Sequence, residues 1–119
     1  MNTSNILRGG IYIADLNPCV GSEQGGTRPV LVISNNTGNR YSPTIIISAI
    51  TGKITQKKEI PTHCHIDTTS GLSLDSIVLG EQLRTIDKSR LKKYVGHLDD
   101  EKMNEVDKAL AVSLGLLLF

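Results

Sequence analysis

A continuous apolar run, Val30-Leu31-Val32-Ile33, lies between Arg28-Pro29 and a turn-rich segment at residues 35–39. A run of β-branched and aliphatic residues bounded by turn signals predicts a strand that is buried on both faces. Residues 44–50, Thr-Ile-Ile-Ile-Ser-Ala-Ile, repeat this pattern and predict a second strand of the same kind.

Further strands and two helices are predicted on either side of this pair. Residues 11–16 combine β-branched and aromatic side chains, and shorter strands are expected at residues 62–66 and 76–84, which makes about five in all. Asp87 is expected to cap a short helix that runs to Lys93. Residues 99–101, Asp-Asp-Glu, place negative charge at the start of a longer helix.

The last helix should carry one apolar stripe that packs on the sheet, because four residues recur near helical spacing: Met103, Val106, Leu110 and Leu117. Strands come first and helices last, without alternation of the two. This order favours an antiparallel α+β domain, a twisted, partly closed sheet or small barrel with helices on its flank. A doubly wound nucleotide-binding fold is not expected.

The composition fits one small domain. The chain has 119 residues, of which 39% are hydrophobic, so we expect residues 1–119 to form a single domain with one core. A net charge of +1 exerts no long-range attraction on nucleic acid, so a polyanion site must come from local clustering of the 13 Lys and Arg residues. The first residues lack the features of a signal peptide, and the apolar end at 114–119 is far below the roughly 20 residues of a membrane span. We expect a cytoplasmic protein without membrane contact, whose apolar end lies in the core or in a dimer contact.

The most informative segment for function is residues 21–29, Gly-Ser-Glu-Gln-Gly-Gly-Thr-Arg-Pro, a polar loop that leads into a buried strand. Its glycines allow the backbone to approach a ligand closely, but it lacks the ending of a phosphate-binding P-loop. Arg28 precedes a proline and is therefore biased toward an extended conformation at the start of the strand. Thr51 also lies at a strand end, and two strand ends can converge on one site. A solvated arginine and a threonine bonded to local backbone remain the simpler interpretations.

The histidines and cysteines are a weaker candidate site. His63 and His65 stand two apart on a predicted strand and share one face, whereas Cys64 points to the other. They could form a metal or acid–base pair, but no further ligand cluster is evident, so we expect no metal and no other cofactor. Cys19 and Cys64 lack CxxC spacing and are expected to be free thiols in a reducing compartment.

Several blocks of the sequence, in matching order, resemble MazF/PemK toxins, in particular the branch found in Gram-positive bacteria. They are residues 8–9, 14–18, 21–26, 28–32, 49–51, 61–63, 75–76, 81–87 and 97–100, which together span nearly the full chain. Gly10 and His65 depart from the family pattern, since an acid commonly stands at each position. These departures put the exact target sequence in doubt.

The resemblance implies an SH3-like barrel with flanking helices and a C-terminal helix, in a homodimer. It also implies a sequence-specific, metal-independent endoribonuclease (mRNA interferase) of a type II toxin–antitoxin system, which cuts single-stranded RNA at a short motif containing U and A. The partner would be a MazE-like antitoxin, an acidic segment with interspersed apolar residues that folds on binding. A CcdB-like inhibitor of DNA gyrase and a non-catalytic RNA-binding module are the alternatives.

Arg28 and Thr51 match the catalytic pair of that family. The implied reaction is attack of the ribose 2′-hydroxyl on the adjacent phosphate, leaving a 2′,3′-cyclic phosphate or 3′-phosphate and a 5′-hydroxyl. Arg28 suits stabilisation of the charged phosphorane first and proton transfer second, because a guanidinium stays protonated. Thr51 would donate a hydrogen bond to a non-bridging oxygen.

The resemblance also implies a set of RNA-binding residues. Carboxylates and amides can pair with the edges of unstacked bases, and a lysine can contact the phosphate backbone. The simpler interpretation of Glu81 and Gln82 is the exposed face of a strand. For Lys53, Lys57 and Lys58 it is a solvated basic run. The positions that match the family's groove are Ser22, Glu23, Gln24 and Gly25 in the glycine-rich loop, Glu81 and Gln82 near the end of a strand, and Lys57.

Overall fold

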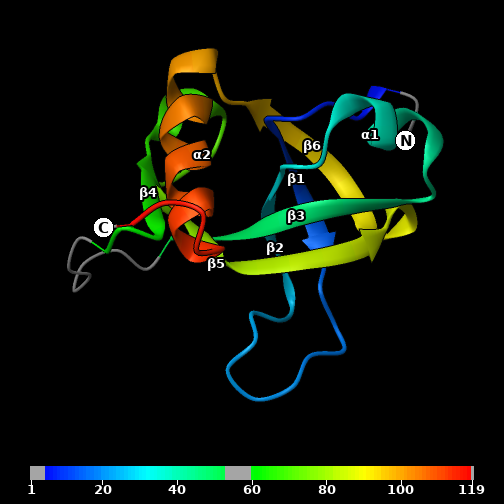
Figure 1. Cartoon of the computed structure of the whole chain (residues 1–119). Coiled ribbons are helices and arrows are strands. Elements are labelled where there is room, and N and C mark those ends of the chain that lie inside the picture. The colour runs from blue at the N-terminus through cyan, green and yellow to red at the C-terminus, as the bar shows by residue number, and fades with distance from the viewer. Residues whose placement is uncertain (1–4, 53–59, 119) are drawn as a thin grey trace.

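The structure, a computed structural model, describes residues 5–52 and 60–118, which contain one sheet of six antiparallel strands in the order β4-β5-β3-β2-β1-β6. Two α-helices and two 3₁₀ turns complete the described part of the chain, and Figure 1 shows their arrangement. The strands are β1 (Gly10–Asp15), β2 (Thr27–Val32), β3 (Thr44–Thr51), β4 (His63–Ile66), β5 (Ser76–Asp87) and β6 (Leu91–His97). The other elements are α1 (Asn36–Tyr41), η2 (Thr68–Ser70), η3 (Lys88–Arg90) and α2 (Asp100–Ser113). The expected antiparallel α+β class is confirmed.

The sheet bends sharply along β5. Ser48 of β3 pairs with Leu83, but Ile50 pairs with Val78, so residues 79–82 of β5 stand opposite Ala49 alone. Such a bulge turns a strand and lets a sheet curl toward a barrel. The first part of β5 also pairs with β4, which is therefore carried to one side of the sheet (Figure 1).

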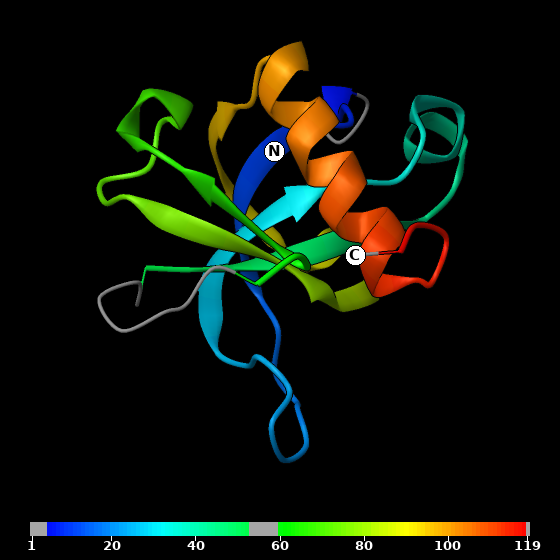
Figure 2. The same cartoon turned by 60° about the vertical axis from the view of Figure 1, so that its left-hand side comes forward.

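Both faces of β2 are buried, as its sequence predicts. Leu31 belongs to a cluster that includes Met103 and Val106 of α2, whereas Val30 and Val32 belong to a second cluster. The buried apolar residues thus form two clusters rather than the single core expected. In β3 the prediction holds only in part, because Ile46 is 42% exposed. Helix α2 packs against β4 and β5, and Figure 2 shows it crossing the sheet.

The turn expected at residues 35–39 is wrong, since residues 36–41 form α1. The side chain of Asn35 accepts a hydrogen bond from the Gly38 N–H at 2.7 Å, which is the geometry of a helix N-cap. Asn39 is fully buried, and its amide donates to the Ser34 carbonyl at 2.8 Å. Residues that favour turns therefore begin a helix here, because their side chains satisfy the backbone at its start.

The helix expected from Asp87 to Lys93 is also wrong beyond its first turn. Asp87 does act as an N-cap, accepting from the Ser89 N–H at 2.8 Å, but η3 ends at Arg90. The following residues form β6, which pairs along β1, with Lys93 opposite Ile13. Pairing with an open strand edge outweighs the local preference of this polar segment. The sheet consequently has a sixth strand, and β5 runs three residues further than expected.

The C-terminal helix begins where its sequence predicts. Asp99 accepts from the Lys102 N–H at 2.8 Å, and Met103, Val106 and Leu110 are buried. Leu117 is wrongly placed in the predicted stripe, because α2 ends at Ser113 and Leu117 is 46% exposed. The described apolar residues that follow the helix are likewise exposed and not part of the core: Leu114, Leu116 and Leu118. No helix within residues 5–52 and 60–118 has the length and apolar character needed to span a membrane.

Candidate active site

Arg28 and Thr51 lie at the neighbouring ends of β2 and β3. Val30 pairs with Ala49 and Val32 pairs with Ile47 in an antiparallel register. Continuing this register by two residues places Arg28 opposite Thr51, with both side chains on the face that Val30 and Ala49 share. Continued in this way, the register sets two side chains that are 23 positions apart in the sequence beside each other at adjacent strand ends.

The side chain of Arg28 is tied to the glycine-rich loop. It is half-buried, and its Nε donates to the carbonyl of Gly25 at 2.8 Å. This bond orients the guanidinium relative to the strand and couples it to the position of the loop. The donors of a guanidinium form a rigid fork, so holding Nε restricts the positions that the other two nitrogens can take.

The loop between β1 and β2 projects away from the sheet, as both Figure 1 and Figure 2 show. Its two arms are joined at the root, where the Leu16 N–H donates to the Gly26 carbonyl at 2.9 Å. The Gly26 N–H donates to the side-chain oxygen of Asn17 at 3.0 Å. Gly26 has a φ of 77°, a left-handed conformation that favours glycine, so the loop closes there without strain.

Most of the tip of this loop is exposed. Ser22 and Glu23 are open to solvent, and Gly25 is half-buried. The Glu23 carboxylate accepts from the Val20 N–H at 2.6 Å, and the Glu23 N–H donates to the Val20 carbonyl at 3.1 Å. These two bonds form a turn at the tip of the loop, which lies outside the paired strands of the sheet.

Gln24 and Gln82 meet, although they are far apart in the sequence. The Gln24 N–H donates to the side-chain oxygen of Gln82 at 3.3 Å. Gln82 sits in the bulge of β5, which faces the loop. A small cavity of about 150 Å³ lies between them, lined by both glutamines together with Glu23, Arg84 and core residues. The structure therefore joins the loop and the bulge into one polar surface.

Glu81 is bound from the side of β4. Its carboxylate accepts from the Thr62 hydroxyl at 3.0 Å and lies 3.1 Å from Nε2 of His63. Partial burial raises the pKa of Glu81, but hydrogen bonds from its own backbone, His63 and Thr62 outweigh burial and leave the pKa below its ordinary value. Glu81 and Gln82 were expected near the end of a strand, and this is wrong. They lie in the middle of β5, because the strand continues to Asp87.

The remaining candidates do not converge. The side chain of His63 is only 6% exposed, whereas His65 is exposed and Cys64 is buried, with its pKa raised mainly by burial. In the part of the chain that the structure describes, no three His, Cys, Asp or Glu side chains come together as a metal site. Cys19 and Cys64 are free thiols, as expected. The expected RNA contact at Lys57, and its neighbours Lys53 and Lys58, lie outside the described residues.

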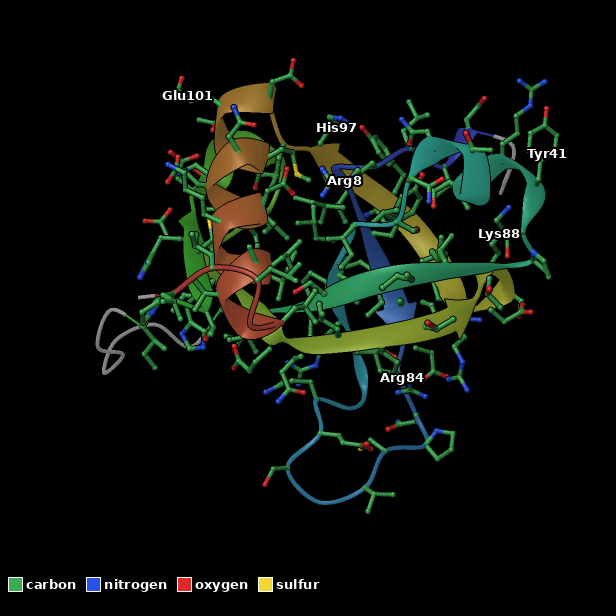
Figure 3. The ribbon with its side chains drawn as sticks, in the orientation of Figure 1. Arg8, Tyr41, Arg84, Lys88, His97 and Glu101 are labelled. Carbon is green, nitrogen blue, oxygen red and sulfur yellow. The ribbon has the colours of Figure 1, made fainter. Side chains whose placement is uncertain are left out.

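Sequence reasoning missed two arginines that hold the root of the loop. Arg84 of β5 and Arg90 of η3 donate to backbone carbonyls between Asp15 and Pro18. Figure 3 shows Arg84 between β5 and the loop. Neither residue belongs to a motif, and their targets are main-chain groups, so no residue pattern could have shown these contacts.

A bent antiparallel sheet, a C-terminal helix and a polar loop beside two strand ends define a class of small α+β protein that recurs among solved structures. An endoribonuclease from Mycobacterial species is 29% identical, with a TM-score of 0.78 over 98% of this chain and 95% of that one. An endoribonuclease in complex with its cognate antitoxin, also from Mycobacterial species, is 30% identical, with a TM-score of 0.79 over 96% and 99%. MazF from Deinococcus radiodurans is 25% identical, with a TM-score of 0.78 over 92% and 96%.

The chain belongs to the family of PemK-like, MazF-like toxins of type II toxin–antitoxin systems, whose sequence model matches residues 7–114. It is 57% identical over 115 residues to the endoribonuclease EndoA of Bacillus subtilis (strain 168), which covers 96% of this chain and 98% of that protein. The family that the sequence blocks indicated is thereby confirmed.

Proposed function

We propose that this chain is an endoribonuclease, the toxin of a type II toxin–antitoxin system, and that Arg28 and Thr51 are its catalytic residues. Membership of the toxin family and the name of the Bacillus subtilis relative support the activity. The observation that supports the site assignment is the β2–β3 register, because its continuation by two residues would set a cationic and a hydroxyl side chain at adjacent strand ends. That pair suits a reaction in which negative charge develops on phosphate oxygens.

The proposed reaction is an internal transesterification that needs no metal. The ribose 2′-oxygen bonds to the adjacent phosphorus, the bond from phosphorus to the 5′-oxygen breaks, and a 2′,3′-cyclic phosphate forms. The 2′-hydroxyl loses one proton and the 5′-oxygen gains one, so the step is balanced. Arg28 stabilises the additional charge on the phosphorane, and Thr51 donates a hydrogen bond to a non-bridging oxygen. DNA lacks the attacking hydroxyl and is not cut.

The loop and the β5 bulge are the proposed reading surface for single-stranded mRNA. Gln24 and Gln82 support this assignment, because their contact joins the two segments beside the cavity of about 150 Å³. Amide groups can donate to and accept from base edges, which is how short motifs of unstacked bases are recognised. The full proposed set of RNA-binding residues is Ser22, Glu23, Gln24, Gly25, Glu81, Gln82 and Lys57.

The proposed partners follow from the relatives. The Mycobacterial endoribonuclease was solved with its cognate antitoxin, and MazF of Deinococcus radiodurans with MazE. We accordingly assign a MazE-like antitoxin to this chain. We also propose a homodimeric state, a cytoplasmic location and a single domain over residues 1–119 without a cofactor.

The test is cleavage of a mixed single-stranded RNA pool in EDTA, with the new ends read by sequencing. The wild type should cut at one short motif and leave 5′-hydroxyl ends. Arg28→Ala and Thr51→Ala should each lower kcat by about 100- to 1,000-fold, the range found when one oxyanion donor is removed. Both variants should keep the circular dichroism spectrum of the wild type.

Two matched controls are available elsewhere in the molecule. Arg40→Ala removes a cation from α1, where the guanidinium lies over the Tyr41 ring, and Thr85→Ala removes an exposed hydroxyl from β5. Both controls should cleave at the wild-type rate. Intact RNA in every wild-type reaction would refute the proposed activity, and full activity of Arg28→Ala would refute the proposed site.

A further inference from the structure

Two arginines hold four consecutive backbone carbonyls at the start of the β1–β2 loop. Arg84 donates from Nη1 to the carbonyl of Leu16 and from Nη2 to that of Pro18 at 3.2 Å. Arg90 donates from Nη1 to the carbonyl of Asp15 at 3.1 Å and to that of Asn17. All four acceptors lie within residues 15–18, where β1 ends and the projecting loop begins.

The two arginines bind these carbonyls in different ways. Arg84 uses both terminal nitrogens, one for each carbonyl, so its planar fork is required. Arg90 makes both of its bonds from a single nitrogen. An ammonium group also has several donors on one nitrogen, so a lysine can reproduce the second arrangement but not the first.

We call the contacts of Arg84 and Arg90 with the carbonyls of residues 15–18 the clamp. A short series of hydrogen bonds connects this clamp to Arg28. Asn17, whose carbonyl Arg90 holds, accepts at its side-chain oxygen from the Gly26 N–H at 3.0 Å. Gly25, the residue before Gly26, accepts from Nε of Arg28 at 2.8 Å. The position of the Arg28 guanidinium therefore depends on where the two arms of the loop are held.

We infer that Arg84 and Arg90 are positioning residues of the proposed ribonuclease: they fix the loop root, and through it the guanidinium of Arg28 and the reading surface at Gln24. This inference rests on the proposed function. Each arginine acts through backbone carbonyls, so it contributes geometry rather than contact with the reacting phosphate. A displacement of about 1 Å at a catalytic group can lower a rate by about 100-fold.

The first part of the experiment compares Met and Lys variants at both positions, with RNA cleavage as the assay. Arg84→Met and Arg90→Met keep the apolar stem but lose the donors, and each should lower kcat by about 10- to 100-fold. Arg84→Lys should show a similar loss, because it cannot restore the fork. Arg90→Lys should stay within about threefold of the wild type. Arg40→Ala again serves as the control for lost charge.

The second part separates positioning from direct binding of RNA. Affinity for RNA with a 2′-deoxy sugar at the cut site is measured at several salt concentrations. An arginine that contacts a phosphate contributes about 0.7 to the slope of log K against log salt for single strands. We expect the slopes of Arg84→Met and Arg90→Met to equal that of the wild type, because no phosphate contact is lost.

Three outcomes would overturn the inference. A slope reduced by about 0.7 would assign the arginine to phosphate binding instead. Wild-type kcat in both Met variants, alongside an inactive Arg28→Ala, would refute the clamp and leave the proposed function standing. Absence of cleavage by the wild type would refute both. Thermal unfolding monitored by circular dichroism shows whether each variant is folded. If Arg84→Met is unfolded, the inference is tested by the two Lys variants: it requires a lower kcat in Arg84→Lys than in Arg90→Lys.

Discussion

Ser48 makes a buried side-chain hydrogen bond from β3 to the bulge of β5. It is fully buried, and its hydroxyl donates to the carbonyl of Leu79 at 2.7 Å. Leu79 is the first of the four bulged residues that stand opposite Ala49. Ser48→Ala removes this donor without adding volume, so it tests whether one hydrogen bond between β3 and the bulge holds the corner of the sheet.

The expected cost is that of depriving a buried carbonyl of a donor. Such losses amount to about 1–3 kcal/mol, and the complete burial of Ser48 argues for a value of about 2 kcal/mol. For a chain of this size that corresponds to a decrease in Tm of about 8 °C. Gln82 lies in the same bulge, so we also expect weaker discrimination among RNA sequences.

The measurement is thermal unfolding of the wild type and Ser48→Ala, supported by urea unfolding to confirm an unchanged m value. Ser73→Ala is the matched control, because Ser73 is exposed and exposed substitutions usually change stability by less than about 0.5 kcal/mol. A decrease in Tm below about 2 °C for Ser48→Ala would refute the reasoning, since it would show that the bulge does not depend on this bond.

Two further predictions concern titratable groups. Because the pKa of Glu81 is lowered in the folded state, its contribution to stability is present above its ordinary value of 4.5 and is lost as the pH falls through the folded pKa. Unfolding of Glu81→Gln should therefore be easier than that of the wild type at pH 6, and this difference should shrink as the pH falls below 4.5. A difference independent of pH would contradict this. Cys19 is exposed, whereas Cys64 is 5% exposed and burial raises its pKa. Iodoacetamide at pH 8 should label Cys19 at least about 10-fold faster, as mass spectrometry of the peptides would show, and equal rates would be the contrary result.

Local patterns were sufficient where burial and capping have strong residue preferences. The run at residues 30–32 is apolar at every position, and a strand buried on both faces admits no polar residue, so its place in the sheet was predictable. The same is true of Asp99, because a side chain that accepts from the N–H three residues later is a local event.

The segment after Arg90 shows why other predictions failed. Residues 91–97 are mostly polar or exposed and carry no clear period, so their own sequence does not distinguish strand from helix. They become β6 because β1 offers an open edge, and that edge exists only once β1 and β2 have paired. Likewise, Asn39 reads as a turn residue until a partner at Ser34 allows its burial within a helix.

The candidate site divides in the same way. By itself, the sequence determined the residue types and order: a glycine-rich loop that ends in Arg28, a hydroxyl at the end of an apolar strand, and enough matching blocks to indicate the toxin family. Only the tertiary structure decided which groups meet. Glu81 is bound by Thr62 and His63, and Arg84 holds a carbonyl 66 residues away. Contacts of this kind depend on register and on a bulge, which are set by how strands pair across the whole sheet, and a main-chain carbonyl leaves no mark in the sequence that binds it.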